Sequence, residues 1–134
     1  MNAFIVELAD RPGAFAQAAE AIAQKGINVT GFAGLAVGGS GGVVLITNDE
    51  AGTRSALANA GLRSREVELV TVGIENKPGT IAEIARKLAD AGINIEAGVP
   101  IGMEGDKVQV AFATSDAAKA RQVLGERVMT PTMG

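Results

Sequence analysis

Two stretches decide the fold of this chain because they repeat each other: residues 9–29 read ADRPGAFAQAAEAIAQKGINV, and residues 75–95 read ENKPGTIAEIARKLADAGINI. The copies are 66 residues apart without a gap. Across residues 4–29, nine of 26 positions are identical to their counterparts, where composition alone predicts about two. The chain is therefore predicted to be an internal duplication whose two copies fold alike.

Each copy begins with a pattern typical of a strand, a turn and a helix. In the first copy, residues 4–8 are rich in β-forming side chains, and Pro12 and Gly13 interrupt them. Proline suits the first position of a helix, where its missing N–H has no partner to lose. Apolar side chains then recur at helical spacing over residues 14–25, and Gly26 follows where a left-handed cap is favoured. The second copy repeats the pattern.

A hairpin of two strands is expected after the first helix of each copy. The strands are predicted at residues 27–37 and 43–47, and at residues 93–101 and 108–113. Glycine-rich loops at residues 38–42 and 102–106 join them. The first of these loops is interpreted as a flexible hairpin loop and not as a phosphate-binding loop, because it joins two strands and no Gly-Lys-Ser/Thr follows.

A second helix in each copy is predicted to begin after an aspartate that can cap it, Asp49 or Asp116, and to end near Gly61 or Gly125. A fourth strand should follow each helix. In the first copy it runs, without a linker, into the first strand of the second copy. In the second copy residues 126–134 remain for it, and their proline limits it to a short or edge strand.

The predicted fold class is α+β, with two tandem ferredoxin-like β-α-β-β-α-β units. In each unit two helices cover one face of an antiparallel sheet. The predicted domains are residues 1–66 and residues 67–134. Each is close to the size at which burial on folding is marginal, so each half is expected to depend on the other.

Composition argues against several classes of function. The net charge is −3 and the basic residues are scattered, so neither nucleic acid nor a membrane surface is an expected partner. The chain has no cysteine and no histidine, which removes thiolate chemistry and the commonest general base and metal ligand. No catalytic residue, metal site or cofactor is predicted. The N-terminus lacks a signal-peptide pattern, and a cytoplasmic protein is expected.

The joint pattern of a Pro-Gly loop, a helix and Gly-Ile-Asn, present twice at fixed spacing, resembles the ACT family of small-molecule-binding regulatory domains. The resemblance covers the whole chain. It implies a stand-alone regulatory protein that is not an enzyme. It also implies that an amino acid binds between paired ACT units and that a partner enzyme of amino-acid metabolism reads out the binding. A homodimer is expected, since side-by-side sheets are the usual pairing in the family.

The resemblance places the ligand between the loop before the first helix and a second strand. Backbone N–H groups at the helix start favour a carboxylate, a glycine lets the backbone approach it, and strand carbonyls accept the ammonium. The loop candidates are Asp10, Arg11, Pro12, Gly13 and Ala14 in the first copy, and Asn76, Lys77, Pro78, Gly79 and Thr80 in the second. The strand candidates are Asn28, Val29, Asn94 and Ile95.

The charges of the two loops differ. Asp10 puts a carboxylate where the ligand's would lie, whereas Asn76 and Lys77 do not repel it, so the second loop is expected to be the better anion receptor. Serine-sensing members of the family carry a histidine two positions before the loop Asp or Asn. This chain has Leu8 and Ile74 there, which favours a small or apolar amino acid.

Two other functions remain open from the sequence. One is an assembly module that pairs sheets with another protein and binds no small molecule. The other is a small hydrolase similar to acylphosphatase, which needs an arginine in a phosphate-cradling loop. Arg11 is the only candidate for that role, and Lys77 replaces it in the second copy.

Overall fold

The computed structural model describes residues 1–125. The chain divides into two compact units, Met1–Val67 and a second that begins at Glu68. The first contains β1 (Asn2–Ala9), α1 (Ala14–Ala23), β2 (Val29–Val37), β3 (Ser40–Thr47) and α2 (Glu50–Asn59). The second contains α3 (Thr80–Asp90), β5 (Ile95–Glu104), β6 (Lys107–Thr114) and α4 (Ala117–Leu124). β4 (Ser64–Glu75) begins in the first unit and continues into the second.

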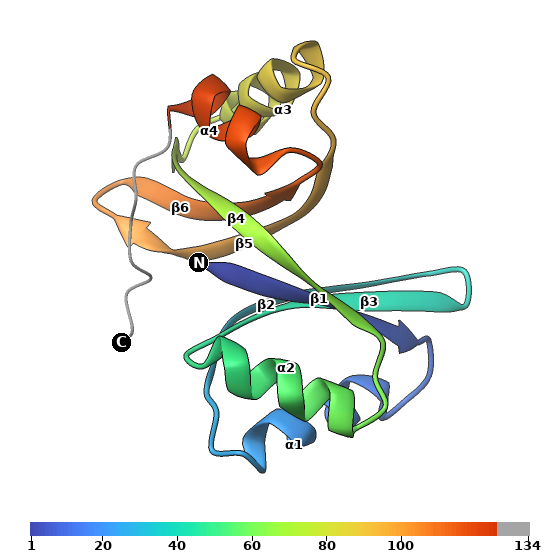
Figure 1. Cartoon of the computed structure of the whole chain (residues 1–134). Helices are drawn as coiled ribbons and strands as arrows, with labels where there is room; N and C mark the ends of the chain where they lie inside the picture. The colour runs from blue at the N-terminus through green and yellow to red at the C-terminus, as the bar shows by residue number, and fades with distance from the viewer. Residues whose placement is uncertain (126–134) are drawn as a thin grey trace. The chain divides into compact units, whose positions relative to one another are not determined.

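The sheet of the first unit is antiparallel, with the order β2-β3-β1. The chain after α2 runs beside β1: the Glu7 N–H donates to the Arg63 carbonyl (2.9 Å), and the Asn2 side chain donates to Glu66 (2.8 Å). In the second unit the order is β4-β6-β5, also antiparallel. Figure 1 shows α1 and α2 on one face of the first sheet, and α3 and α4 on one face of the second. The predicted α+β fold is confirmed.

The predicted aspartate caps are present in the structure, whereas the prediction that proline takes the first helical position is wrong: Pro12 lies one residue before Gly13, the N-cap of α1. The Asp49 carboxylate accepts a hydrogen bond from the Gly52 N–H (2.9 Å), and the Asp116 carboxylate accepts one from the Lys119 N–H (3.0 Å). Each aspartate therefore satisfies one of the backbone donors that a helix start leaves open. The strand expected over residues 126–134 lies outside the described residues.

The extent of the glycine-rich hairpin loops was predicted wrongly. The turn between β2 and β3 consists of Gly38 and Gly39 alone, with φ of 56° and 93°, and β3 already begins at Ser40. Positive φ at both central residues matches the right-handed twist of a hairpin, so two glycines suffice to reverse the chain. The second hairpin likewise turns at residues 105–106. β3, β5 and β6 are therefore longer than predicted, whereas β2 ends at Val37 as predicted and begins two residues later than predicted.

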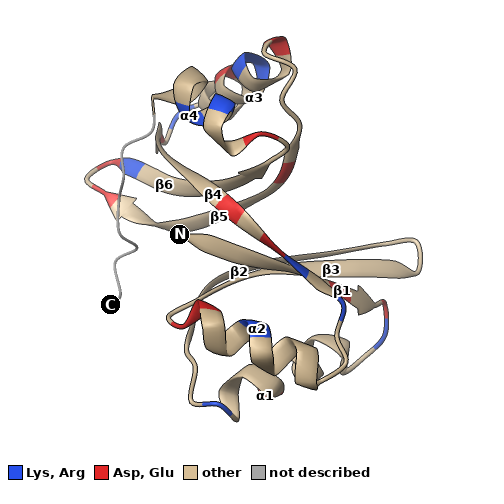
Figure 2. Cartoon of the chain, viewed as in Figure 1, with Lys and Arg blue, Asp and Glu red and all other residues tan. Residues whose placement is uncertain are grey.

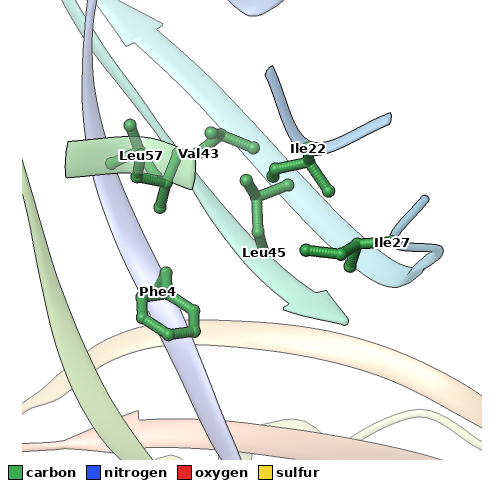
Figure 3. Close-up of a cluster of buried hydrophobic side chains, with 7 residues drawn as sticks. Phe4, Ile22, Ile27, Val43, Leu45 and Leu57 are labelled. Atoms are coloured by element: carbon green, nitrogen blue, oxygen red, sulfur yellow. The ribbon is translucent and has the colours of Figure 1, made fainter. Parts of the chain in front are cut away.

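Phe4 and six aliphatic side chains form the core of the first unit (Figure 3). They come from two helices, the strands and the turn after α1: Phe4, Val6, Ile22, Ile27, Val43, Leu45 and Leu57. In the second unit two clusters of the same kind lie around Val70 and Leu88 and around Ile74 and Phe112. Within the described residues, no helix is long and apolar enough to span a membrane.

Candidate functional site

The loops before α1 and α3 share one backbone conformation. Gly13 precedes α1 with φ 90° and ψ −12°, and Gly79 precedes α3 with φ 92° and ψ −13°. L-residues rarely adopt this left-handed region, whereas glycine enters it without steric cost. A Cβ built on either glycine meets no atom within 4 Å. The backbone angle alone therefore explains both glycines, whether or not a ligand approaches them.

A pocket of about 370 Å³ lies beside the first of these loops. Its lining is mostly apolar and comes from the end of β1, the following loop, the start of α1 and the β2–β3 hairpin: Leu8, Ala9, Asp10, Arg11, Ala14, Phe15, Phe32, Gly34, Leu35, Ala36, Gly41, Gly42 and Val43. The volume falls in the range of about 300–1,000 Å³ that is typical of small-molecule sites. We refer to this as the first-unit pocket.

Small residues on the hairpin leave the space open. In the register of the sheet, Gly34 lies opposite Val43, and Ala36 lies opposite Gly41. Side chains alternate between the two faces of a strand, so these positions share the face on which Phe32 meets α1. The rings of Phe15 and Phe32 are 5.5 Å apart, centroid to centroid. Two aromatic rings therefore form a wall beside positions that carry almost no side chain.

Asp10 and Arg11 supply the charge of the first-unit pocket. Both residues are exposed, and within residues 1–125 neither side chain forms an ion pair or a hydrogen bond. The Arg11 backbone is engaged, since its N–H donates to the Ala9 carbonyl (2.9 Å) and its carbonyl accepts from the Ala14 N–H (3.3 Å). One carboxylate and one guanidinium are therefore held on adjacent residues and are open to a ligand.

The corresponding loop of the second unit lies beside a wider, polar depression of about 800 Å³. Seven residues line it, five of them charged: Glu75, Asn76, Lys77, Met103, Glu104, Asp106 and Lys107. Three carboxylates face two ammonium groups, so the local charge is negative. An anionic ligand group is less favoured here than the loop sequence alone suggests.

Lys77, the cation of the second loop, already forms an ion pair with Glu75. Lys77 Nζ lies 2.9 Å from Glu75 Oε2. This hydrogen bond, with the attraction between the charges, lowers the pKa of Glu75 and raises the pKa of Lys77. The Thr80 hydroxyl is engaged as well, because it donates to the carbonyls of Glu75 (2.7 Å) and Lys77 (3.1 Å). A ligand would have to compete with these contacts.

The strand candidates lie away from the first-unit pocket. Asn28 and Val29 stand at the start of β2, whereas the pocket is lined by residues 32 and 34–36 nearer its end. The Asn28 N–H donates to the Asn48 side chain (3.0 Å), and its carbonyl accepts from the Asn48 N–H (3.1 Å). Asn94 makes the same two bonds with Ser115, both at 2.9 Å, just before Ile95 begins β5.

The structure thus brings together only part of the predicted set. Asp10, Arg11 and Ala14 line the first-unit pocket, and Asn76 and Lys77 line the second depression. Pro12, Gly13, Pro78, Gly79 and Thr80 shape the two loops without lining either space. Within residues 1–125, no three residues of the types His, Cys, Asp or Glu are grouped closely enough to hold a metal ion.

The hairpin residues of the first-unit pocket were missed by sequence reasoning. One signal was available: residues 26–48 contain no charged residue (Figure 2). Within this stretch Phe32, Gly34 and Ala36 alternate at strand spacing, which puts a large side chain beside two small ones on one face. That pattern indicates a hollow, although it does not say which helix faces it.

No protein-family model matches the sequence, and no curated protein matches it either. Solved structures do match. Protein BT0572 from Bacteroides thetaiotaomicron is similar over 92% of this chain and 85% of its own, with TM-score 0.74 and 20% identity. The ligand-free regulatory subunit of aspartate kinase from Thermus thermophilus matches over 92% and 89%, with TM-score 0.61 and 20% identity. A structure of aspartokinase alpha and beta subunits matches over the same shares, with TM-score 0.61 and 25% identity.

The chain has an ACT-like fold. The TM-scores of 0.61 to 0.74 establish a shared architecture, and identities of 20–25% leave ligand and partner to be argued from the chain's own residues.

Proposed function

We propose that this chain is a non-enzymatic regulatory protein that binds a free amino acid and transmits the binding to an enzyme of amino-acid metabolism. The observation that carries the proposal is the first-unit pocket, where a free carboxylate and a free guanidinium border an open, mostly apolar hollow. The likeness in fold to the regulatory subunit of aspartate kinase supports a regulatory function. The proposal places the protein in the cytoplasm, where free amino acids and metabolic enzymes meet.

The charges fit the chemistry of an amino acid. Its ammonium and carboxylate are two bonds apart and have opposite signs, as do Asp10 and Arg11, which are adjacent in the chain. Arginine offers a planar set of donors that matches a carboxylate. α1 begins at Ala14, which also lines the pocket, so the positive potential of its first backbone N–H groups adds to that of Arg11.

Regulation requires that the ligand bind two states of the protein with different affinity. The partner enzyme would then bind one of those states better, and the coupling would be reciprocal: a ligand that strengthens the complex binds more tightly in it. We propose that the loop at residues 10–13 transmits the change, because it joins the pocket to both β1 and α1.

A thermal-shift screen against the twenty amino acids tests the proposal. A ligand present at about 100 times its dissociation constant adds about 2.7 kcal/mol to the free energy of unfolding. We expect a rise in Tm for one or a few amino acids, and loss of that rise in Arg11→Gln but not in Lys25→Gln, a matched exposed cation outside the pocket. A flat response to all twenty would contradict amino-acid binding.

A second candidate function is an assembly module without a small-molecule ligand, and the free edge of β2 favours it. Among the described strands β2 pairs only with β3. Its exposed side chains are large and apolar: Phe32, Leu35 and Val37 are 59%, 73% and 66% exposed. Sheet edges that are long, regular and uncharged pair readily with another strand.

β5, at the end of the second unit's sheet, is protected by comparison. It contains Pro100, which has no N–H to donate, and two register irregularities, and it carries Glu96 and Glu104. β2 has one irregularity, at its start, and no charge. We therefore propose that a homodimer forms, with or without a ligand, through antiparallel pairing of β2 with β2 of a second copy.

Light scattering coupled to size exclusion tests the homodimer. Leu35→Lys places a charge on the free edge and is expected to shift the protein to monomer, while Met103→Lys on β5 is expected to leave the mass unchanged. Met103 is a suitable control because it is also 59% exposed on an outer strand. An unchanged dimer mass in Leu35→Lys would rule out β2 as the interface.

A further inference from the structure

The lining of the first-unit pocket indicates the class of amino acid. We propose that it binds a free amino acid with an apolar side chain, and that the depression in the second unit does not. This inference rests on the proposed function, because it assumes an amino-acid ligand. The eleven lining residues other than Asp10 and Arg11 are all aliphatic, aromatic or glycine. No serine, threonine, asparagine or glutamine side chain is among them.

The absence of polar side chains from this lining sets the selectivity. A ligand hydroxyl or amide that enters an apolar space gives up its bonds to water and gains no partner in return. A methyl group of the same size loses nothing and gains contact with the walls. Hydrophobic pockets of this kind discriminate against an added hydroxyl by up to about a hundredfold.

The floor of the pocket has room for a side chain. A Cβ built on Gly34 makes only ordinary contacts, 3.6 Å to the Gly42 carbonyl oxygen and 3.8 Å to Val43 Cγ2. Both atoms belong to β3, the neighbouring strand of the same sheet, and no atom of α1 lies within 4 Å of that Cβ. Gly34, Phe15 and Phe32 line the same pocket. An apolar ligand group would rest on this glycine with an aromatic wall beside it.

The second unit lacks the same hollow, as the strand registers show. Leu8 lies opposite Gly41 in the first unit, whereas Ile74 lies opposite Val108 in the second. Val108 packs against the cluster of Ile74, Val110 and Phe112 and so covers the floor. The cation of the second loop is also paired with Glu75. Both the apolar space and the free charge are therefore found in the first unit.

Isothermal titration of the full chain with isosteric amino acids tests the inference. Valine and threonine differ by a methyl and a hydroxyl, and leucine and asparagine are close in shape. We expect valine and leucine to bind at least about tenfold more tightly than their polar counterparts. Equal or tighter binding of threonine or asparagine would overturn the inference.

A substitution that fills the first-unit pocket at Gly34 tests the same inference from the side of the protein. Gly34→Val is expected to weaken binding at least about tenfold, because its side chain occupies the space of the ligand. Ala16→Leu adds similar bulk to an exposed position of α1 outside the pocket and should bind normally. Far-UV circular dichroism verifies that each variant folds, and Ala36→Leu fills the pocket from a second position should Gly34→Val fail to fold.

The outcomes separate the inference from the proposed function. Apolar preference that is lost in Gly34→Val supports both. Binding of a polar amino acid that is lost in Lys77→Gln and kept in Gly34→Val would overturn the inference and leave a regulatory amino-acid protein in place. Binding of no amino acid would overturn both and favour the assembly module.

Discussion

Gly13→Ala distinguishes a conformational role for the loop glycine from a ligand-binding one. Gly13 has φ 90°, and a Cβ there would meet nothing, so the cost is confined to the backbone. Placing an L-residue in the left-handed region costs about 1–2 kcal/mol. Replacing any glycine by alanine also restricts the unfolded chain, which returns about 0.4–1 kcal/mol. We expect Gly13→Ala to lower the free energy of unfolding by about 1 kcal/mol.

Gly34→Ala is the matched control. It removes a glycine from the same unit at a position where the φ angle is ordinary and the new Cβ fits at 3.6 Å or more. The unfolded-state gain is common to both variants, so their difference isolates the left-handed cost and should be about 1–2 kcal/mol. Gly79→Ala, at φ 92°, repeats the measurement in the second unit.

Urea unfolding followed by far-UV circular dichroism measures these differences, since the chain has no tryptophan or tyrosine for fluorescence. Equal stability of Gly13→Ala and Gly34→Ala would refute the conformational argument. A folded Gly13→Ala protein of normal stability that no longer binds an amino acid would instead show that the missing Cβ is needed by the ligand.

Three further predictions concern stability and ionisation. Asp49→Ala removes the cap on the Gly52 N–H and is expected to cost about 0.5–2 kcal/mol of unfolding free energy in urea, with Asp49→Asn as the control that keeps a cap. Leu57→Ala empties a fully buried site and should cost about 2–5 kcal/mol, measured in the same way. Lys77 lowers the pKa of Glu75, so this pair stabilises above the unfolded pKa of the carboxyl and the effect is lost as pH falls through its folded pKa. In Lys77→Gln the pKa of Glu75 should rise toward 4.5 in a carbon-detected NMR titration, and an unchanged pKa would contradict the pairing.

Local rules predicted the elements of this fold because each signal acts within a few residues. Pro12 and Gly13 mark a strand-to-helix turn, and Asp49 caps a helix whose donor is three residues away. The extent of the glycine-rich hairpin was predicted wrongly because only two positive φ angles, at Gly38 and Gly39, reverse the chain. The remaining glycines continue as strand, and their number in sequence does not give the length of the turn.

The candidate site was only partly predictable because it depends on register. The loop residues Asp10 and Arg11 could be selected from the sequence, since they precede a helix. The small residues at the bottom of the pocket could not be predicted without the strand register. Gly41 lies opposite Leu8, and Ala36 lies opposite Gly41, and these pairings form only when three strands assemble. The contact of Lys77 with Glu75 is local by comparison, since the two residues are two positions apart at the end of β4.

β2 contributes both to the proposed amino-acid pocket and to the proposed dimer edge, so the two proposals are linked. Phe32 is a wall of the first-unit pocket and is also exposed on the free edge of β2, where Leu35 is exposed as well. A second copy paired along β2 would lie next to the pocket and change how it is closed. Because coupling between two binding events is reciprocal, any factor by which the ligand strengthens this pairing is the factor by which pairing strengthens ligand binding. Together the two proposals predict that adding the amino acid to the protein changes the fraction of dimer, which light scattering with and without the ligand measures.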